Sequence, residues 1–233
     1  MKHIFFTALL SSCLLICAAQ QSDVFKYNAA ENTQEDLVTR MLKYPQFTKG
    51  KAFFANGTVT EALFNYHYDT NQILFINAKN DTLELAEPEL YQQIVIDSDT
   101  FLYTKQGFLQ LVSATPVCKL LVKRNLILIG SEKKSAYGGY SATSSSTALN
   151  SYPDGTMHRI INTDENYVYR YRDSYFFTDR FQNIYLANKK GARDLGWKKE
   201  KEVKSFIEKA NINFEKKEDI MKLVSFFQTI GIE

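Results

Sequence analysis

Residues 59–77, VTEALFNYHYDTNQILFIN, are the stretch that decides the fold. Two short runs of apolar, aromatic and β-branched residues, 59–68 and 72–77, flank the turn-forming Asp69-Thr70-Asn71. β-Branched and aromatic side chains favour strands, whereas Asn and Asp side chains stabilise turns through local hydrogen bonds. Two such runs joined by a short turn predict an antiparallel hairpin.

The same alternation of strand-like runs and turns extends over residues 50–130. Asn56-Gly57 supplies the positive-φ residues that tight hairpins need, and further Asn and Asp clusters mark turns. Because no helical stretch separates the runs, neighbouring strands are expected to pair as an antiparallel meander. The expected strands are residues 51–54, 59–68, 72–77, 82–85, 92–96, 100–104, 108–113 and the continuously apolar 119–129, then 158–162, 167–172, 175–178 and 183–187.

Helical periodicity is confined to the two ends of the chain. Residues 33–44 predict a helix that begins with Thr33 and Asp36 in a capping box and is ended by Pro45. Near the C-terminus, apolar spacing predicts a pair of amphipathic helices, the second capped by Asn213. The predicted fold class is therefore α+β: mainly an antiparallel β meander, in an open or partly closed sheet, with an N-terminal helix and a C-terminal helical pair.

The chain divides into four segments along its length. Residues 1–19 are expected to be a signal peptide, 20–49 an N-terminal lead with a short helix, 50–187 the β-rich domain, and 188–233 C-terminal helices packed on the same domain. Within the β-rich domain, the Gly- and Ser-rich residues 131–157 predict a long loop. Loops of that length are often functional.

The first residues have the layout of a secretory signal. Lys2 precedes an apolar run over residues 4–16, and small residues up to Ala19 precede a polar stretch. The run is shorter than the roughly 20 apolar residues that a spanning helix needs, so we expect no transmembrane span in the mature chain. The predicted location is the periplasm or the exterior. The alternative is a lipid anchor at Cys13.

Charge and cysteine content limit the classes of function. The chain has 28 Lys and Arg and 26 Asp and Glu, and removal of the leader with Lys2 leaves 27 basic residues. This near balance argues against a nucleic-acid partner. The leader also removes two of the three cysteines, so Cys118 alone cannot form an internal disulfide. No motif predicts a cofactor, since glycine-rich phosphate loops are absent.

Candidates for catalysis or metal binding are isolated residues. Ser141 lies in a sequence like a nucleophile elbow that lacks its last glycine, and Cys118 needs a nearby base to become a thiolate. His67 and His158 are the histidines of the mature chain. The acidic residues in 97–99 are too few ligands for Ca²⁺ and are expected to form a turn. We therefore assign no catalytic or metal site.

One alternating stretch is a binding candidate. Tyr167, Tyr169 and Tyr171 share one strand face, and Arg170 and Arg172 lie on the other. Exposed tyrosines can stack on sugar rings and arginines can bind carboxylates. The simpler interpretation is that the tyrosines pack beneath the C-terminal helices and the arginines are solvated.

The 131–157 loop adds two further candidates. Tyr137 and Tyr140 flank its paired glycines and complete the predicted set of binding residues.

Several segments carry a family resemblance. The runs 54–57, 62–66, 73–76 and 81–83, the Ala136-Tyr137-Gly138 segment and the lysine-rich tail resemble exported β-rich proteins of Bacteroidetes. The resemblance implies a Gram-negative envelope setting and carries over no catalytic residue.

Three hypotheses of function follow. The favoured one is an exported, non-catalytic envelope module that binds a protein or a glycan, and it predicts an exposed aromatic patch. The second is an envelope hydrolase that uses Ser141 or Cys118 with a histidine, and it predicts hydrogen-bonding distance between them. The third is a lipid-anchored accessory of an outer-membrane assembly.

Overall fold

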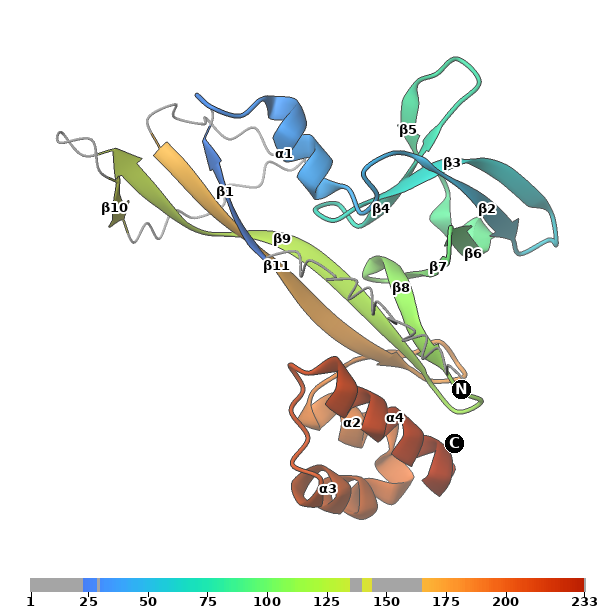
Figure 1. Cartoon of the computed structure of the whole chain (residues 1–233). Coiled ribbons are helices and arrows are strands. Elements are labelled where there is room, and N and C mark those ends of the chain that lie inside the picture. The colour runs from blue at the N-terminus through green and yellow to red at the C-terminus, as the bar shows by residue number, and fades with distance from the viewer. Residues whose placement is uncertain (1–22, 29, 135–139, 144–164, 233) are drawn as a thin grey trace, which may run out of the picture.

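The computed structural model describes residues 23–28, 30–134, 140–143 and 165–232. These residues form one large antiparallel sheet, with three C-terminal helices gathered below it in the view and one N-terminal helix beside its first strand (Figure 1). The strands are β1 (Val24–Asn28), β2 (Thr48–Phe54), β3 (Val59–His67), β4 (Gln72–Ile76), β5 (Thr82–Glu84), β6 (Tyr91–Ile96), β7 (Asp99–Thr104), β8 (Gly107–Ala114), β9 (Lys119–Lys134), β10 (Tyr140–Thr143), β11 (Glu165–Thr178) and β12 (Ile184–Leu186). The helices are α1 (Gln34–Met41), α2 (Lys189–Leu195), α3 (Glu200–Lys209) and α4 (Lys217–Ile230), with short 3₁₀ turns at Pro88–Leu90 and Trp197–Lys199.

The sheet contains two successive meanders. Strands β2 to β5 form the first and β6 to β9 the second, and the two join where β6 pairs with β2. The order across the described sheet is β1-β11-β9-β8-β7-β6-β2-β3-β4-β5, so β1 and β5 are its outer strands. This arrangement confirms the predicted α+β class and the antiparallel meander.

The long hairpin of β9 and β11 connects all parts of the molecule (Figure 1). Its register runs from Lys119 opposite Thr178 to Lys133 opposite Glu165. Two of the predicted strands, 167–172 and 175–178, are thus one strand. Burial on both faces, predicted for 119–129, holds at Leu120 and Leu121, whereas Ile129 at the far end is 42% exposed.

Hydrophobic packing among the described residues forms three clusters. The helical cluster packs α2, α3 and α4 against Leu120 and Phe177 at one end of the hairpin. The sheet cluster fills the concave side of β2 to β8, around Phe64 and Phe101. The third cluster packs α1 and β1 on the other half of the hairpin, around Leu126.

The ends of the helices differ from prediction in two places. The capping box of Thr33 and Asp36 is present, but α1 ends at Met41 instead of Tyr44. Leu42 is extended and bridges to His67, because the chain begins to pair with β3 before it reaches Pro45. The N-cap position of α4 is Lys216, and the predicted cap Asn213 instead accepts a hydrogen bond from the Glu215 backbone N–H in the preceding turn.

Two segments were not predicted as they occur. β1 pairs with β11, although no strand is predicted for its residues. Within the predicted 131–157 loop, residues 131–134 continue β9, and residues 140–143 form β10. The predicted strand 158–162 lies outside the described residues. Among the helices that are described, none is both long and apolar enough to cross a membrane.

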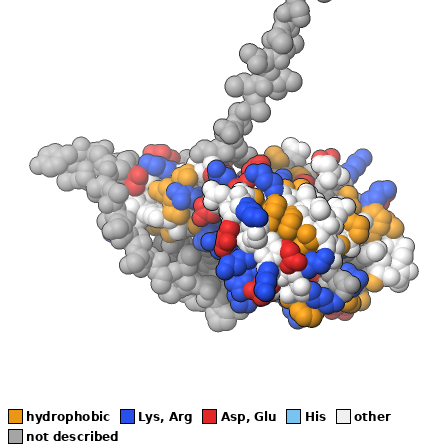
Figure 2. Space-filling model, turned by 90° about the horizontal axis from the view of Figure 1, so that it is seen from below, with side chains coloured by type: hydrophobic (Ala, Val, Ile, Leu, Met, Phe, Trp, Pro, Cys, Tyr) orange, Lys and Arg blue, Asp and Glu red, His pale blue; other side chains and the backbone are white. Residues whose placement is uncertain are grey.

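The helical end of the molecule has a mixed surface charge. Figure 2 shows Lys and Arg side chains interspersed with Asp and Glu on the face seen from below. The ion pair Arg193–Glu200 and the pair Lys190–Asp194 are examples. This face therefore has no single sign of charge.

Replacement of Gly191 tests the close packing of α2 on β12. A Cβ atom at this position would lie 2.0 Å from the Leu186 carbonyl oxygen. Alanine favours a helix interior by about 1 kcal/mol, but this clash forces α2 away from the sheet. We expect Gly191→Ala to lower the free energy of unfolding by about 1–3 kcal/mol in urea titration.

Gly130→Ala is the matched control. A Cβ there meets no atom within 4 Å, so its free energy of unfolding should stay within about 0.5 kcal/mol of the parent. Equal stability of the two variants would contradict the close approach of α2.

Candidate ligand-binding groove

The predicted tyrosine face is an interior surface. Tyr167 and Tyr169 are 6% and 2% exposed and belong to the third cluster with Tyr27 and Leu126. They pack beneath α1 and β1, not beneath the C-terminal helices, and Phe25 of β1 stacks on Tyr169 with ring centroids 5.4 Å apart. These two residues therefore offer no exposed stacking face, and the simpler interpretation that they pack beneath helices holds with α1 as the covering helix.

The other predicted binding residues are placed differently. Tyr171 is half-buried and its hydroxyl donates to the Arg40 carbonyl oxygen at 2.7 Å, while Arg170 and Arg172 are exposed. Tyr140 begins β10, but its side chain lies outside the description, as does all of Tyr137.

Cys118 has a structural environment. It is 2% exposed within the helical cluster, and the Thr115 hydroxyl lies 3.7 Å from its sulfur. Burial raises the pKa of the Cys118 thiol, which opposes formation of the nucleophilic thiolate.

Of the other residues of the hydrolase hypothesis, only His67 is described with its side chain. His67 lies on β3, where burial lowers its pKa and its Nδ1 is 3.2 Å from the Thr70 backbone nitrogen. Ser141 is described by its backbone alone, and His158 lies outside the description. Over the part of the chain that is described, no group of three or more His, Cys, Asp or Glu side chains is placed to hold a metal.

A polar hollow that the sequence did not predict lies between the concave sheet and the hairpin. This inner hollow has a volume of about 460 Å³. Its lining combines three tyrosine rings with amide, carboxylate and cationic groups. They are Tyr66, Tyr68, Tyr175, Gln110, Asp99, Asp173, Lys43, Arg124 and Lys217, beside Leu111, Val112 and Val122.

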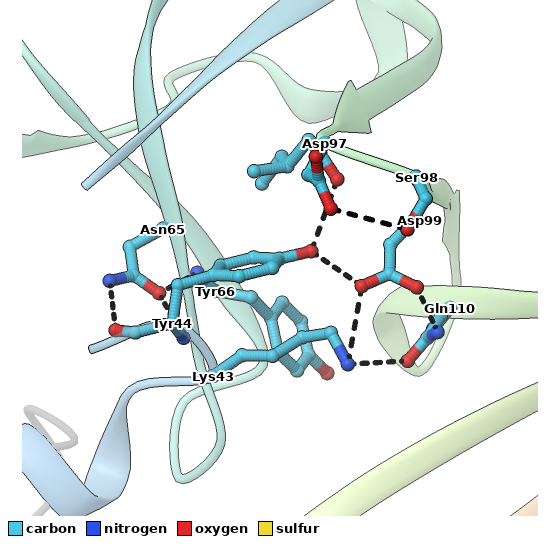
Figure 3. A network of polar contacts seen from close by, with 9 residues as sticks. Lys43, Tyr44, Asn65, Tyr66, Asp97, Ser98, Asp99 and Gln110 are labelled. Carbon is cyan, nitrogen blue, oxygen red and sulfur yellow. Dashed lines mark hydrogen bonds and ion pairs between the residues drawn. The ribbon is translucent and has the colours of Figure 1, made fainter. Parts of the chain in front are cut away.

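Asp99 organises one wall of the inner hollow (Figure 3). Its Oδ2 accepts the Tyr44 hydroxyl at 2.7 Å, and its Oδ1 accepts the Gln110 amide at 2.7 Å. The Lys43 ammonium lies 3.4 Å from the same carboxylate and donates to the Gln110 side-chain oxygen at 3.1 Å. Burial and the neighbouring Asp99 raise the pKa of Tyr44, so this phenol remains a proton donor.

A buried amide holds this wall in place. Asn65 is fully buried; its side chain accepts from the Tyr44 backbone N–H at 3.1 Å and donates to the Tyr44 carbonyl at 2.9 Å (Figure 3). These bonds satisfy the buried amide and fix the segment after α1 against β3.

Arg124 and Asp173 form the opposite wall. They face each other across β9 and β11, and the guanidinium donates two hydrogen bonds to the carboxylate, of 2.7 and 2.9 Å. Tyr68 lies beside this pair, and burial raises its pKa to about 12. Its hydroxyl is protonated at neutral pH, as an ordinary phenol is.

Two further hollows adjoin the inner one. The α1 hollow, of about 410 Å³, lies between α1, β1 and β11 and shares Lys43 with the inner hollow. The edge hollow, of about 430 Å³, lies where β11 is uncovered between β1 and β12 and shares Arg124 and Asp173 with it. The three hollows, which share these lining residues, are together called the groove.

The residue types around the inner hollow bear on the hydrolase hypothesis. Among the described residues that line the inner hollow there is no serine, cysteine or histidine, and the carboxylates of Asp99 and Asp173 are both held by donors. No family model, curated protein or solved structure matches the chain. The function is therefore argued from the geometry of the site.

Tyr44→Phe tests the Asp99 wall. The change removes the donor at Asp99 Oδ2 and leaves a half-buried carboxylate with fewer partners. We expect a loss of about 1–3 kcal/mol in the free energy of unfolding, measured in urea. Tyr103→Phe, at a tyrosine that is 38% exposed, is the control and should change it by less than about 0.5 kcal/mol. A Tyr44→Phe variant as stable as this control would refute the role of the bond.

Alkylation tests the environment of Cys118. In the native chain at pH 8, iodoacetamide should leave Cys118 unmodified, because its thiol is buried and its pKa is raised, and unfolding in urea should make it reactive. Peptide mass mapping separates this adduct from those of Cys13 and Cys17. A cysteine introduced by Ser98→Cys, in an exposed turn, is the positive control. Equal native labelling at both positions would favour the hydrolase hypothesis.

Proposed function

We propose that this chain is an exported, non-catalytic binding module of the cell envelope and that its groove binds a saccharide. The observation that carries the proposal is the lining of the inner hollow, in which the half-buried ring of Tyr175 lies beside fixed polar groups, while Tyr66 and Tyr68 are buried and form part of its floor. Aromatic faces bind the C–H faces of sugars, while amide, carboxylate and guanidinium groups orient hydroxyls.

The polar groups are arranged before any ligand binds. Gln110 is held by Asp99 and Lys43, and Arg124 is held by Asp173. Because these side chains are already ordered, a ligand that meets them loses little additional conformational entropy on binding.

The same contacts favour binding over hydrolysis. A glycosidase needs one carboxyl group that donates a proton and a second that acts as base or nucleophile. Asp99 accepts from Tyr44 and Gln110, and Asp173 is occupied by Arg124 in a bidentate pair. The hydrolase that uses Ser141 or Cys118 with a histidine stays the alternative.

The envelope setting rests on the leader. Residues 1–19 have the layout of a signal peptide, and cleavage after Ala19 would release the chain to the periplasm or the exterior. Lipidation at Cys13 would instead place the groove on a membrane-anchored accessory. Both outcomes are compatible with an envelope glycan as the ligand, in the Gram-negative setting that the resemblance to Bacteroidetes proteins implies.

A glycan array followed by calorimetry tests the proposal. The purified chain should bind a subset of arrayed oligosaccharides, and the best of them should then be titrated against Gln110→Ala, whose side chain lines the inner hollow. We expect this variant to lose about tenfold in affinity, equivalent to one strong hydrogen-bonding group.

Gln92→Ala is the control, because Gln92 is an exposed glutamine on β6 outside the groove. It should bind as the parent does, and thermal melts of both variants should show intact folding. An array without binding, or a folded Gln110→Ala variant with unchanged affinity, would overturn the proposal.

A further inference from the structure

We infer that the saccharide is acidic and that its anionic groups bind on the two sides of Lys43. This inference rests on the proposed function and deepens it by naming the chemistry of the ligand. It comes from the charges that line the α1 hollow and the inner hollow, which meet at Lys43.

Cations outnumber acids along these two hollows. The acidic residues are Asp36, Asp99 and Asp173. The basic residues are Lys26, Arg40, Lys43, Arg124 and Lys217. Lys26 is offset by Glu132, which lies outside the two linings, so the positive charge that these two hollows keep comes from Arg40 and Lys217. The chain as a whole is nearly balanced, with 28 basic and 26 acidic residues, so this charge is a local property of the two hollows.

The acids are already occupied by donors. Asp36 accepts the Thr33 backbone N–H at 2.7 Å in the capping box of α1. Asp99 accepts from Tyr44 and Gln110, and Asp173 is paired with Arg124. Their charges are therefore partly neutralised and repel an incoming anion less than free carboxylates would.

Two of the cations keep their charge available. Arg40 and Lys217 are exposed, and within the described part of the chain neither forms an ion pair. The Arg40 guanidinium lies over the Phe25 ring, 4.6 Å from its centroid, which orients it without neutralising it. One such cation thus lies in each hollow, with Lys43 between them.

The edge hollow has the opposite balance. It is lined by Asp23, Asp173 and Glu215 against Arg124 and Arg172. An acidic saccharide would be repelled there, so its charged units are expected in the hollows that flank Lys43 and a neutral unit beside Arg172. The charges of the lining therefore predict the orientation in which an acidic saccharide lies along the groove.

A pair of matched ligands tests the inference. The probes are a hexamer of galacturonic acid and the same hexamer with its carboxylates methyl-esterified, with a heparin-derived hexasaccharide and inorganic phosphate to separate carboxylate, sulfate and simple anion binding. We expect the acidic hexamer to bind at least about fivefold more tightly than its ester, with an advantage that falls as salt rises.

Substitutions show which cations bind the acidic hexamer. Arg40→Gln and Lys217→Gln should each weaken the acidic hexamer by about two- to fivefold and leave the ester unchanged. Lys190→Gln is the control, since this lysine is exposed and paired with Asp194 outside the groove. Preference for the ester, variants without effect, or phosphate that binds as tightly as the hexamer would overturn the inference.

The failures of the two proposals are distinguishable. If a neutral glycan from the array binds while the acidic probes do not, the acidic chemistry is wrong and the saccharide function stands. If no saccharide of any charge binds, the proposed function fails with it.

Discussion

The pairing of β9 with β11 is the constraint on which the rest of the structure depends. Paired residues lie on the same face of the sheet, so the register places Leu120 with Phe177, Arg124 with Asp173, and Leu128 with Tyr169 on one side. All three hydrophobic clusters of the described residues draw on this side. A slip of β11 by one residue would turn Phe177, Asp173 and Tyr169 to the opposite face, so the register is strongly specified.

The charged pair in the middle of the hairpin explains why a groove exists. Apolar pairs at both ends are covered by helices, whereas Arg124 and Asp173 are satisfied by each other and need no cover. Burying such a pair under apolar residues would cost desolvation free energy. The packing therefore divides around it, and the Asp99 network closes the far wall. The resulting hollow presents fixed polar groups beside tyrosine rings, which is the chemistry of the proposed saccharide site.

Much of the fold could be predicted because its signals are local. The alternation in residues 59–77 appears as β3 and β4, and Thr33 with Asp36 forms the expected capping box. The errors arise where tertiary contacts override local pattern. Leu42 leaves the helix to bridge His67, and residues 24–28 become a strand because β11 offers them an edge. Neither partner is near in sequence, so no local pattern indicates them.

The sequence by itself determined the class of the protein, an antiparallel sheet with helices, and the common face of Tyr167, Tyr169 and Tyr171. Period-two alternation and turn chemistry depend on neighbouring residues, which the sequence displays directly. Only the tertiary structure decided which face is covered and where the groove lies. Lys43, Asp99, Gln110 and Arg124 come from four separate segments, and only the curvature of the sheet over the hairpin brings them together. Their hydrogen bonds join residues distant in the chain, which local sequence pattern does not encode.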